Sequence, residues 1–153
     1  MITKDKIIKV LATGFGAGLS PVMPGTAGTL VGVLICLAFL PLHWIFRFIF
    51  VAVLVGVAVY VSERAEEIYG KKDDQRIVID EIAGFLLAML PVAINFINLA
   101  LAFVLFRIFD IWKPYPLRKF QELPGGWGVV VDDIGAGIYA AAVLLLLVVF
   151  GVL

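Results

Sequence analysis

Apolar residues occupy long blocks along this chain, and most charged residues lie in the segments between those blocks. An α-helix needs about 17 to 25 apolar residues to cross the hydrocarbon core of a bilayer. The block pattern therefore predicts five membrane-embedded helices, at 26–40, 44–62, 77–94, 96–112 and 128–153. The first and third blocks are short, so we expect those helices to be tilted, partly re-entrant or matched by a locally thinner membrane.

The segments between the blocks have the composition of surface structure. Residues 4–13 are basic and weakly amphipathic, which is typical of a short helix lying at the membrane surface. Residues 14–29 are rich in glycine and proline, which disfavours regular structure through their middle. Residues 63–76 are charged, and we expect their first half to extend the preceding helix into water. Residues 113–127 contain three prolines and predict a loop.

Composition supports an integral membrane protein. Hydrophobic residues make up 63% of the 153, charged residues only 16%, and the mean hydropathy is +1.10, whereas a soluble domain is about half apolar and a quarter charged. The predicted fold class is an all-α, polytopic membrane bundle with about five membrane-embedded helices and a short N-terminal interfacial helix, forming one domain over residues 1–153. Net charge is zero and no basic block exists, so nucleic acid is not expected as a partner. No protein partner is evident from the sequence.

The charged residues also predict an orientation. If the N-terminus lies in the cytoplasm and the chain crosses the membrane five times, eleven of the twelve basic residues fall on the inner side, as the positive-inside rule requires. Arg47 is the exception. All twelve acidic residues fall on the same side as the basic ones. The sequence therefore predicts one charged face, turned toward the cytoplasm.

Three charges stand at the end of the apolar block 96–112. Arg107, Asp110 and Lys113 are spaced by three residues, which puts them within about one third of a helix circumference. Prolines directly after Lys113 end any helix there. Charges on the end of an apolar helix are costly, so this face is interpreted as part of a site.

Two pairs of acids stand at the beginnings of other apolar blocks. Asp80 and Glu81 begin the third, and Asp132 and Asp133 begin the fifth. Both pairs and Asp110 belong to helix ends on the same predicted face. Five converging carboxylates would repel one another strongly unless neutralised, and two nearby cationic side chains cannot balance them alone. Hard oxygen ligands without His or Cys favour Mg²⁺ or Mn²⁺ over zinc.

A purely structural interpretation of these acids is that they stabilise helix N-termini and pair with basic residues. An acid at a helix N-terminus is favourable by itself, which accounts for one acid in each helix but poorly for two in succession. The glycine-rich loop also has two interpretations. Gly25 and Thr26, at a helix N-terminus, would offer backbone donors to a phosphate, or the loop is a plain re-entrant connector.

Four motifs resemble, in order and spacing, the bacterial phosphatidylglycerophosphatase A family. They are GFGAGLSPVMPGTAGT (14–29), IVIDEIAG (77–84), FRIFDIWKPYP (106–116) and GGWGVVVDDIGAG (125–137). The resemblance covers nearly the whole chain from about residue 9. It implies a small, multi-pass, Mg²⁺-dependent lipid phosphatase of the bacterial inner membrane, with its active site facing the cytoplasm. Such an enzyme removes the terminal phosphate of phosphatidylglycerophosphate to give phosphatidylglycerol.

The resemblance also implies roles for residues of this chain. Asp80, Glu81, Asp132 and Asp133 are expected to bind metal. Asp110, Arg107 and Lys113 are expected to be catalytic, with the two cations and, more weakly, Gly25 and Thr26 binding the substrate phosphate. Asp73 corresponds to an acid often found in the family, although the proline expected after it is Asp74 here.

Other functions remain open from the residues. A membrane phosphotransferase that uses CDP-activated lipid would also need clustered carboxylates, but this chain lacks the Asp-Gly dipeptide of those enzymes. A cation transporter or channel would place its charges near the bilayer midplane on broken helices, whereas here they gather at one end. Another lipid phosphomonoesterase would have the same pattern.

Overall fold

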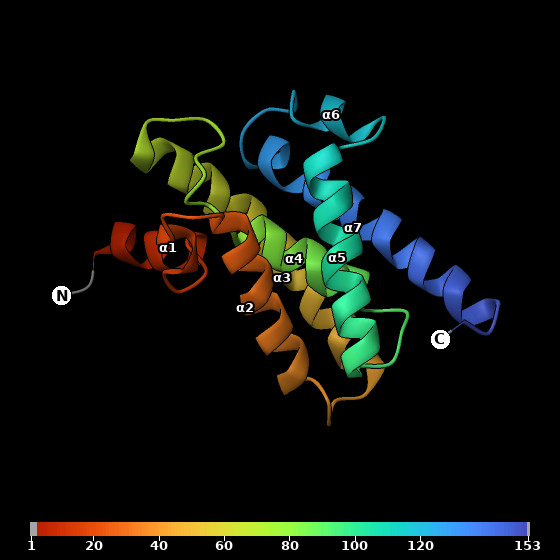
Figure 1. Cartoon of the computed structure of the whole chain (residues 1–153). Helices are drawn as coiled ribbons and strands as arrows, with labels where there is room; N and C mark the ends of the chain where they lie inside the picture. The colour runs from red at the N-terminus through yellow and green to blue at the C-terminus, as the bar shows by residue number, and fades with distance from the viewer. Residues whose placement is uncertain (1–2, 153) are drawn as a thin grey trace.

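The computed structural model describes residues 3–152, and all regular structure within that range is helical. The helices are α1 (Lys4–Ala12), α2 (Pro24–Ala38), α3 (Trp44–Tyr69), α4 (Ile79–Ala88), α5 (Phe96–Trp112), α6 (Leu117–Phe120) and α7 (Gly126–Val149), with a 3₁₀ turn η1 (Ala17–Leu19). The predicted all-α class is confirmed (Figure 1). α3 also continues well beyond the apolar block into the charged segment, as the sequence predicts.

The third predicted helix is much shorter than the apolar block 77–94. α4 has 10 residues, about 15 Å, or half of the hydrocarbon core. It begins at Ile79 because Val78, with a φ of −137°, is not helical, and the Val78 amide donates to the Ala12 carbonyl, 2.8 Å away. It ends before Pro91, which has no amide to continue the helix. The predicted loops also contain short helical pieces, η1 and α6, that the composition did not indicate.

Two helices are long and apolar enough to cross a membrane, judged by length and composition. They are α3 and α7, with mean hydropathies of 2.4 and 2.0 over their most apolar windows. α2 is apolar but has only 15 residues. Large apolar side chains are exposed along α3, including Trp44, Phe46 and Phe48. Such contiguous apolar surface marks association with a membrane or a partner. These features support membrane association, and the five-crossing arrangement stays a prediction.

α4 is the central helix of the bundle. It packs against α2, α3, α5 and α7, and Figure 1 shows it between α2 and α5. Eight of its ten residues are buried. Phe85 of α4 meets Phe106 of α5 edge to face, with ring centroids 6.4 Å apart. Because α4 is surrounded by other helices, the two acids in its first turn, Asp80 and Glu81, lie toward the interior of the bundle.

Glycines bring α4 and α7 into backbone contact. A Cβ on Gly84 would lie 2.6 Å from the Asp133 carbonyl oxygen and 2.7 Å from Cε2 of Phe106. Gly137 of α7 faces the Gly84 backbone in turn. Only glycine fits at such a crossing, and the crossing lies one helical turn from Asp80 and Glu81. The close approach therefore places these two acids beside Asp133.

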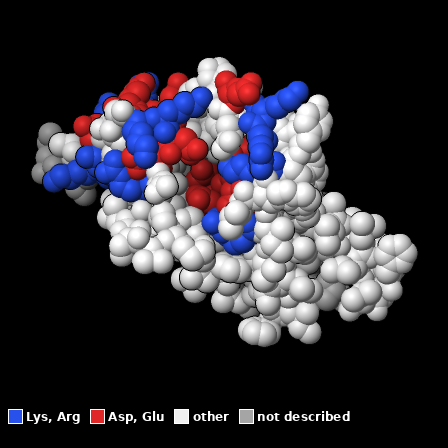
Figure 2. All heavy atoms as spheres, turned by 45° about the horizontal axis from the view of Figure 1, so that its top comes forward, with Lys and Arg blue, Asp and Glu red and all other residues white. Residues whose placement is uncertain are grey.

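The charged residues gather over one end of the molecule. Figure 2 shows blue and red atoms together across that end and white atoms over the rest of the visible face. Arg47, at the beginning of α3, is the basic residue that the sequence places apart from the others. The gathered charges match the single charged face that the sequence predicts. The side of a membrane to which this face turns stays a prediction.

Candidate functional site

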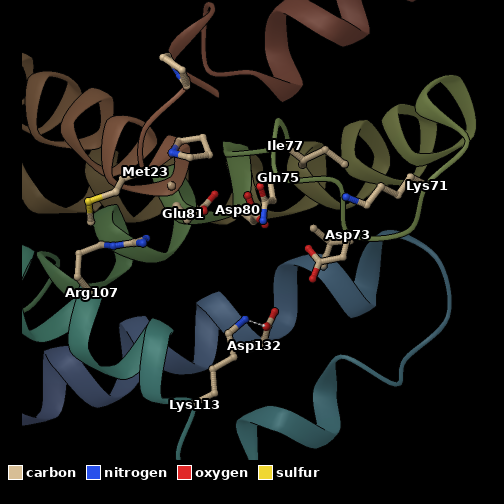
Figure 3. A pocket seen from close by; sticks show the side chains of 14 residues that line it. Met23, Lys71, Asp73, Gln75, Ile77, Asp80, Glu81, Arg107, Lys113 and Asp132 are labelled. Carbon is tan, nitrogen blue, oxygen red and sulfur yellow. Dashed lines mark hydrogen bonds and ion pairs between the residues drawn. The ribbon is translucent and has the colours of Figure 1, made fainter. Parts of the chain in front are cut away.

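A cavity of about 530 Å³ opens at the charged end, between α2, α4, α5 and α7 (Figure 3). Its walls come from three helix N-termini, the C-terminus of α5 and the loop before α4. The lining residues are Pro21, Met23, Pro24, Gly25, Lys71, Asp73, Gln75, Ile77, Asp80, Glu81, Arg107, Lys113, Val129 and Asp132. Six of the residues predicted from the sequence therefore line one cavity, and they are Gly25, Asp80, Glu81, Arg107, Lys113 and Asp132.

Local sequence explains how each charged group reaches the cavity. Asp80 and Glu81 occupy the first turn of α4, where the helix dipole favours negative charge. α5 ends at Trp112 because Lys113 adopts a left-handed conformation, with φ of 47°, and is followed by Pro114. That turn directs the Lys113 side chain toward α7, where its ammonium contacts Asp132.

Three carboxylates form the most compact group. Asp80, Glu81 and Asp133 each offer an oxygen, and these atoms lie within 4.8 Å of one another. Asp80 is 5% exposed and Asp133 is 3% exposed. Asp80 Oδ1 and Glu81 Oε2 are buried, and the described residues supply neither with a hydrogen-bond partner. Unpaired buried carboxylate oxygens at this spacing suit a hard divalent cation, so this donor set fits Mg²⁺.

Two cationic side chains border the carboxylates. Arg107 Nη1 lies 2.6 Å from Asp110 Oδ2. Lys113 Nζ contacts Asp132 and lies 3.8 Å from Asp110 Oδ1 and 4.0 Å from Asp133 Oδ1. Burial by itself would lower the pKa of Lys113, but Asp133 and the other two carboxylates outweigh it and raise that pKa above its usual value. Lys113 therefore stays charged and links the acids of α5 and α7.

Gly25 completes the wall opposite α4. A Cβ at this position would overlap Glu81 Oε1 and lie 3.1 and 3.2 Å from the two terminal nitrogens of Arg107. Because α2 has no side-chain cap, its first amides remain the natural donors for an anion in the cavity. Thr26 does not line the cavity, although its hydroxyl is buried and has no hydrogen-bond partner among the described residues.

The structure brings the seven predicted charged residues together but divides them differently from the sequence expectation. Asp80, Glu81 and Asp133 cluster, whereas Asp132 pairs with Lys113. Asp110 pairs with Arg107 and does not line the cavity. The predicted four-carboxylate metal set is therefore, in the structure, a group of three with the fourth carboxylate held by a lysine. The chemical roles of all seven stay predictions.

Sequence reasoning missed part of one wall. Lys71 and Gln75 line the cavity opposite Arg107, together with Asp73, which only the family resemblance had indicated (Figure 3). Asp73 has a φ of 50°, and its amide donates to Glu66 Oε1 at 2.6 Å, which ties this loop to α3. These residues belong to a charged segment that looked like ordinary solvated surface. Nothing in their spacing distinguishes them from the exposed charges around them.

Fold and site together define a helical protein with membrane-capable helices and a buried site where carboxylates, a lysine and an arginine meet. The sequence profile described as phosphatidylglycerophosphatase A matches residues 10–148. The chain belongs to the phosphatidylglycerophosphatase A family, and it is therefore an enzyme of the phosphatase class. The resemblance found in the motifs is confirmed, which favours a phosphatase over the transporter and phosphotransferase that the residues left open.

Relatives cover most of the chain. Phosphatidylglycerophosphatase A of Escherichia coli is 36% identical over 88% of this chain and 80% of its own length. The Haemophilus influenzae protein of the same name is 39% identical, over 90% and 86%. A candidate phosphatidylinositol-3-phosphatase of Bacteroides thetaiotaomicron is 37% identical, over 86% and 87%. No solved structure matches this one.

Proposed function

We propose that this chain hydrolyses phosphatidylglycerophosphate to phosphatidylglycerol and phosphate, with Mg²⁺ as its cofactor. The observation that carries the proposal is the buried group of Asp80, Glu81 and Asp133 beside Arg107 and Lys113. Unpaired carboxylates supply a metal site, and the adjacent cations suit a phosphomonoester. Relatives named phosphatidylglycerophosphatase A support the choice of lipid.

Asp80, Glu81 and Asp133 would hold the cation, and Asp132, which pairs with Lys113, is the fourth candidate ligand. Bound Mg²⁺ would supply Lewis-acid polarisation of a phosphoryl oxygen and a more acidic water. Arg107 and Lys113 neutralise charge that develops on the transferred phosphoryl group. The first amides of α2, at Gly25 and Thr26, are placed to bind phosphate oxygens.

Asp110 is the remaining carboxylate. It is outside the compact group of three and pairs with Arg107, so it is not assigned to the metal. In the proposed reaction it acts as a general base toward water or attacks phosphorus directly. In the first route Asp110 takes a proton from water, the water oxygen bonds to phosphorus as the bond to the lipid oxygen breaks, and that proton passes to the lipid oxygen, which leaves as an alcohol. In the second route an Asp110 oxygen bonds to phosphorus as the bond to the lipid oxygen breaks and the lipid oxygen takes a proton from water; a water molecule then hydrolyses the aspartyl phosphate, which releases phosphate and restores Asp110.

The proposed setting is the bacterial inner membrane, with the charged end toward the cytoplasm. The distribution of basic residues supports this orientation. α3 and α7 are long enough to cross, and the shorter α2 and α5 would cross where the bilayer is locally thinner. α4 has half the length required to cross. A helix that ends within the membrane is tolerated where its ends are buried in protein, and α4 lies inside the bundle.

A second candidate reaction is removal of phosphate from phosphatidylinositol 3-phosphate. The relative from Bacteroides thetaiotaomicron favours it. Both substrates are phosphomonoesters on a membrane lipid headgroup, so the same carboxylates and cations would serve either one.

Phosphate release from the two lipids in detergent micelles tests the proposal. With Mg²⁺, we expect faster release from phosphatidylglycerophosphate, and excess EDTA should abolish it. Asp80→Asn should remove activity, whereas Glu122→Gln, at an exposed position outside the cavity, should retain it. Equal release with and without EDTA would contradict the metal assignment, and preference for phosphatidylinositol 3-phosphate would contradict the substrate assignment.

A further inference from the structure

An apolar groove of about 610 Å³ runs along the outside of the bundle between α2 and α5. These are the two helices whose ends carry Gly25 and Arg107 at the charged cavity. α2 packs mainly on α4, and α5 packs mainly on α7. α2 and α5 touch each other only slightly. Figure 1 shows them flanking α4. The groove therefore lies along the apolar part of the same two helices, and its residues nearest to the cavity, Leu30 on α2 and Val104 on α5, are within about two helical turns of those cavity residues.

The α5 wall is in register with the site. Phe96, Ala100 and Phe103 line the groove, and Arg107 follows them with the spacing i, i+4, i+7, i+11. Residues at this spacing lie on one face of a helix. Arg107 is thus the polar end of the stripe that forms this wall.

The α2 wall repeats the same spacing. Leu30, Val33 and Leu37 line the groove, and Thr26 precedes them at i, i+4, i+7, i+11. Leu30 and Leu37 are both exposed. Both walls therefore change from apolar side chains to phosphate-binding candidates at the same end.

On α5 the groove is lined from Phe96 to Val104, and Arg107 lies about one helical turn further along. The whole distance from Phe96 to Arg107 matches one leaflet of a bilayer. Eleven residue steps from Phe96 to Arg107 correspond to about 16 Å of helix, and half of a hydrocarbon core is about 15 Å. A molecule that fills this space and reaches Arg107 is apolar over that length and anionic at one end. A phospholipid has this shape and this charge distribution.

We propose that the groove between α2 and α5 holds an acyl chain of the phospholipid substrate and thereby positions its phosphate at Arg107. This inference rests on the proposed function for the identity of the headgroup. Because the chain is already in an apolar medium in the bilayer, the groove gains little from the hydrophobic effect. Its contribution is orientation, which lowers the barrier of a reaction when the reacting groups are held in place.

Ala100→Trp tests the groove, because Ala100 is exposed inside it and lies about 10 Å along α5 from Arg107. Ala142→Trp is the matched control, at an exposed position of α7 outside the groove. We expect Ala100→Trp to lower kcat/KM for the long-chain lipid at least about tenfold. Its kcat/KM for the deacylated, water-soluble headgroup should equal that of the wild type, and the control should retain both activities.

Photochemical cross-linking gives a readout that does not need turnover. A substrate with a diazirine near the end of one acyl chain should label peptides of 30–37 and 96–104 in the wild type, and excess unlabelled lipid should prevent it. Ala100→Trp should lose this labelling. Labelling spread over α3 and α7 without competition would mean ordinary surrounding lipid and would overturn the proposal.

The two readouts separate the failures. If the wild type releases no phosphate from either compound, the proposed function fails, and cross-linking alone decides the groove. If Ala100→Trp loses both activities equally in folded protein, or keeps both, the groove does not position an acyl chain, and the proposed function is unaffected.

Discussion

Gly25→Ala probes how closely α2 approaches the charged groups. The added Cβ would overlap Glu81 Oε1 and lie 3.1 and 3.2 Å from the terminal nitrogens of Arg107. Carbon is in ordinary contact at roughly 3.5 to 4.0 Å, so the Glu81 carboxylate must move by on the order of 1 Å. A displacement of that size at a reacting centre costs about 10²-fold in rate, or about 3 kcal/mol in the barrier.

The same substitution should affect stability much less. Alanine gains about 1 kcal/mol over glycine in a helix, and crowding against flexible side chains costs about 1 to 3 kcal/mol. We therefore expect the free energy of unfolding to change by less than about 2 kcal/mol. Phosphate release from phosphatidylglycerophosphate measures the first effect, and thermal unfolding in detergent measures the second.

Gly56→Ala is the matched control for this experiment. Gly56 lies within α3, and a Cβ there meets nothing within 4 Å. It should keep full activity and gain up to about 1 kcal/mol of stability. If Gly25→Ala were equally active, the Cβ would fit without moving Glu81 or Arg107, and the crowding argument would be refuted.

Three further outcomes follow. Gly84→Ala should destabilise the protein by about 3 kcal/mol or more, because its Cβ meets backbone, and thermal unfolding should show it. Lys113→Met should reduce turnover at least about a hundredfold by leaving three carboxylates without their shared cation; an unchanged rate would exclude Lys113 from the mechanism. Arg76 lowers the pKa of Asp74, so this pair stabilises the fold above about pH 4 and loses that stabilisation as pH falls through the lowered pKa. Arg76→Gln should therefore weaken the dependence of stability on acid, and identical acid profiles would contradict this.

Much of the fold follows from the blocks of apolar residues. All five predicted helices begin within two residues of the predicted positions, because hydropathy changes sharply at those points. The short length of α4 could not be predicted from hydropathy, because burial inside a protein and burial in lipid select the same apolar residues. Pro91 signals the early end of α4, whereas the hydrogen bond from Val78 to Ala12 joins segments far apart in the sequence and has no local signal.

The candidate site was predictable where charges interrupt apolar sequence. Asp80, Glu81 and Arg107 are conspicuous because their neighbours are apolar, and the same residues converge in the structure. Lys71 and Gln75 were not predictable, because nothing separates them from an ordinary charged loop. The pairing of Asp132 with Lys113 depends on how α7 is rotated against α5, which sequence spacing does not specify.

The backbone contact between Gly84 and Gly137 limits how this site can change during evolution. The two helices that carry the clustered carboxylates meet without an intervening side chain, so neither can shift to accommodate a longer ligand or a different spacing. The opposite half of the site belongs to α2 and α5, which touch only slightly and have a groove between them. Relatives that differ in their named lipids would therefore keep the α4–α7 half as a common frame and diverge in the α2–α5 half.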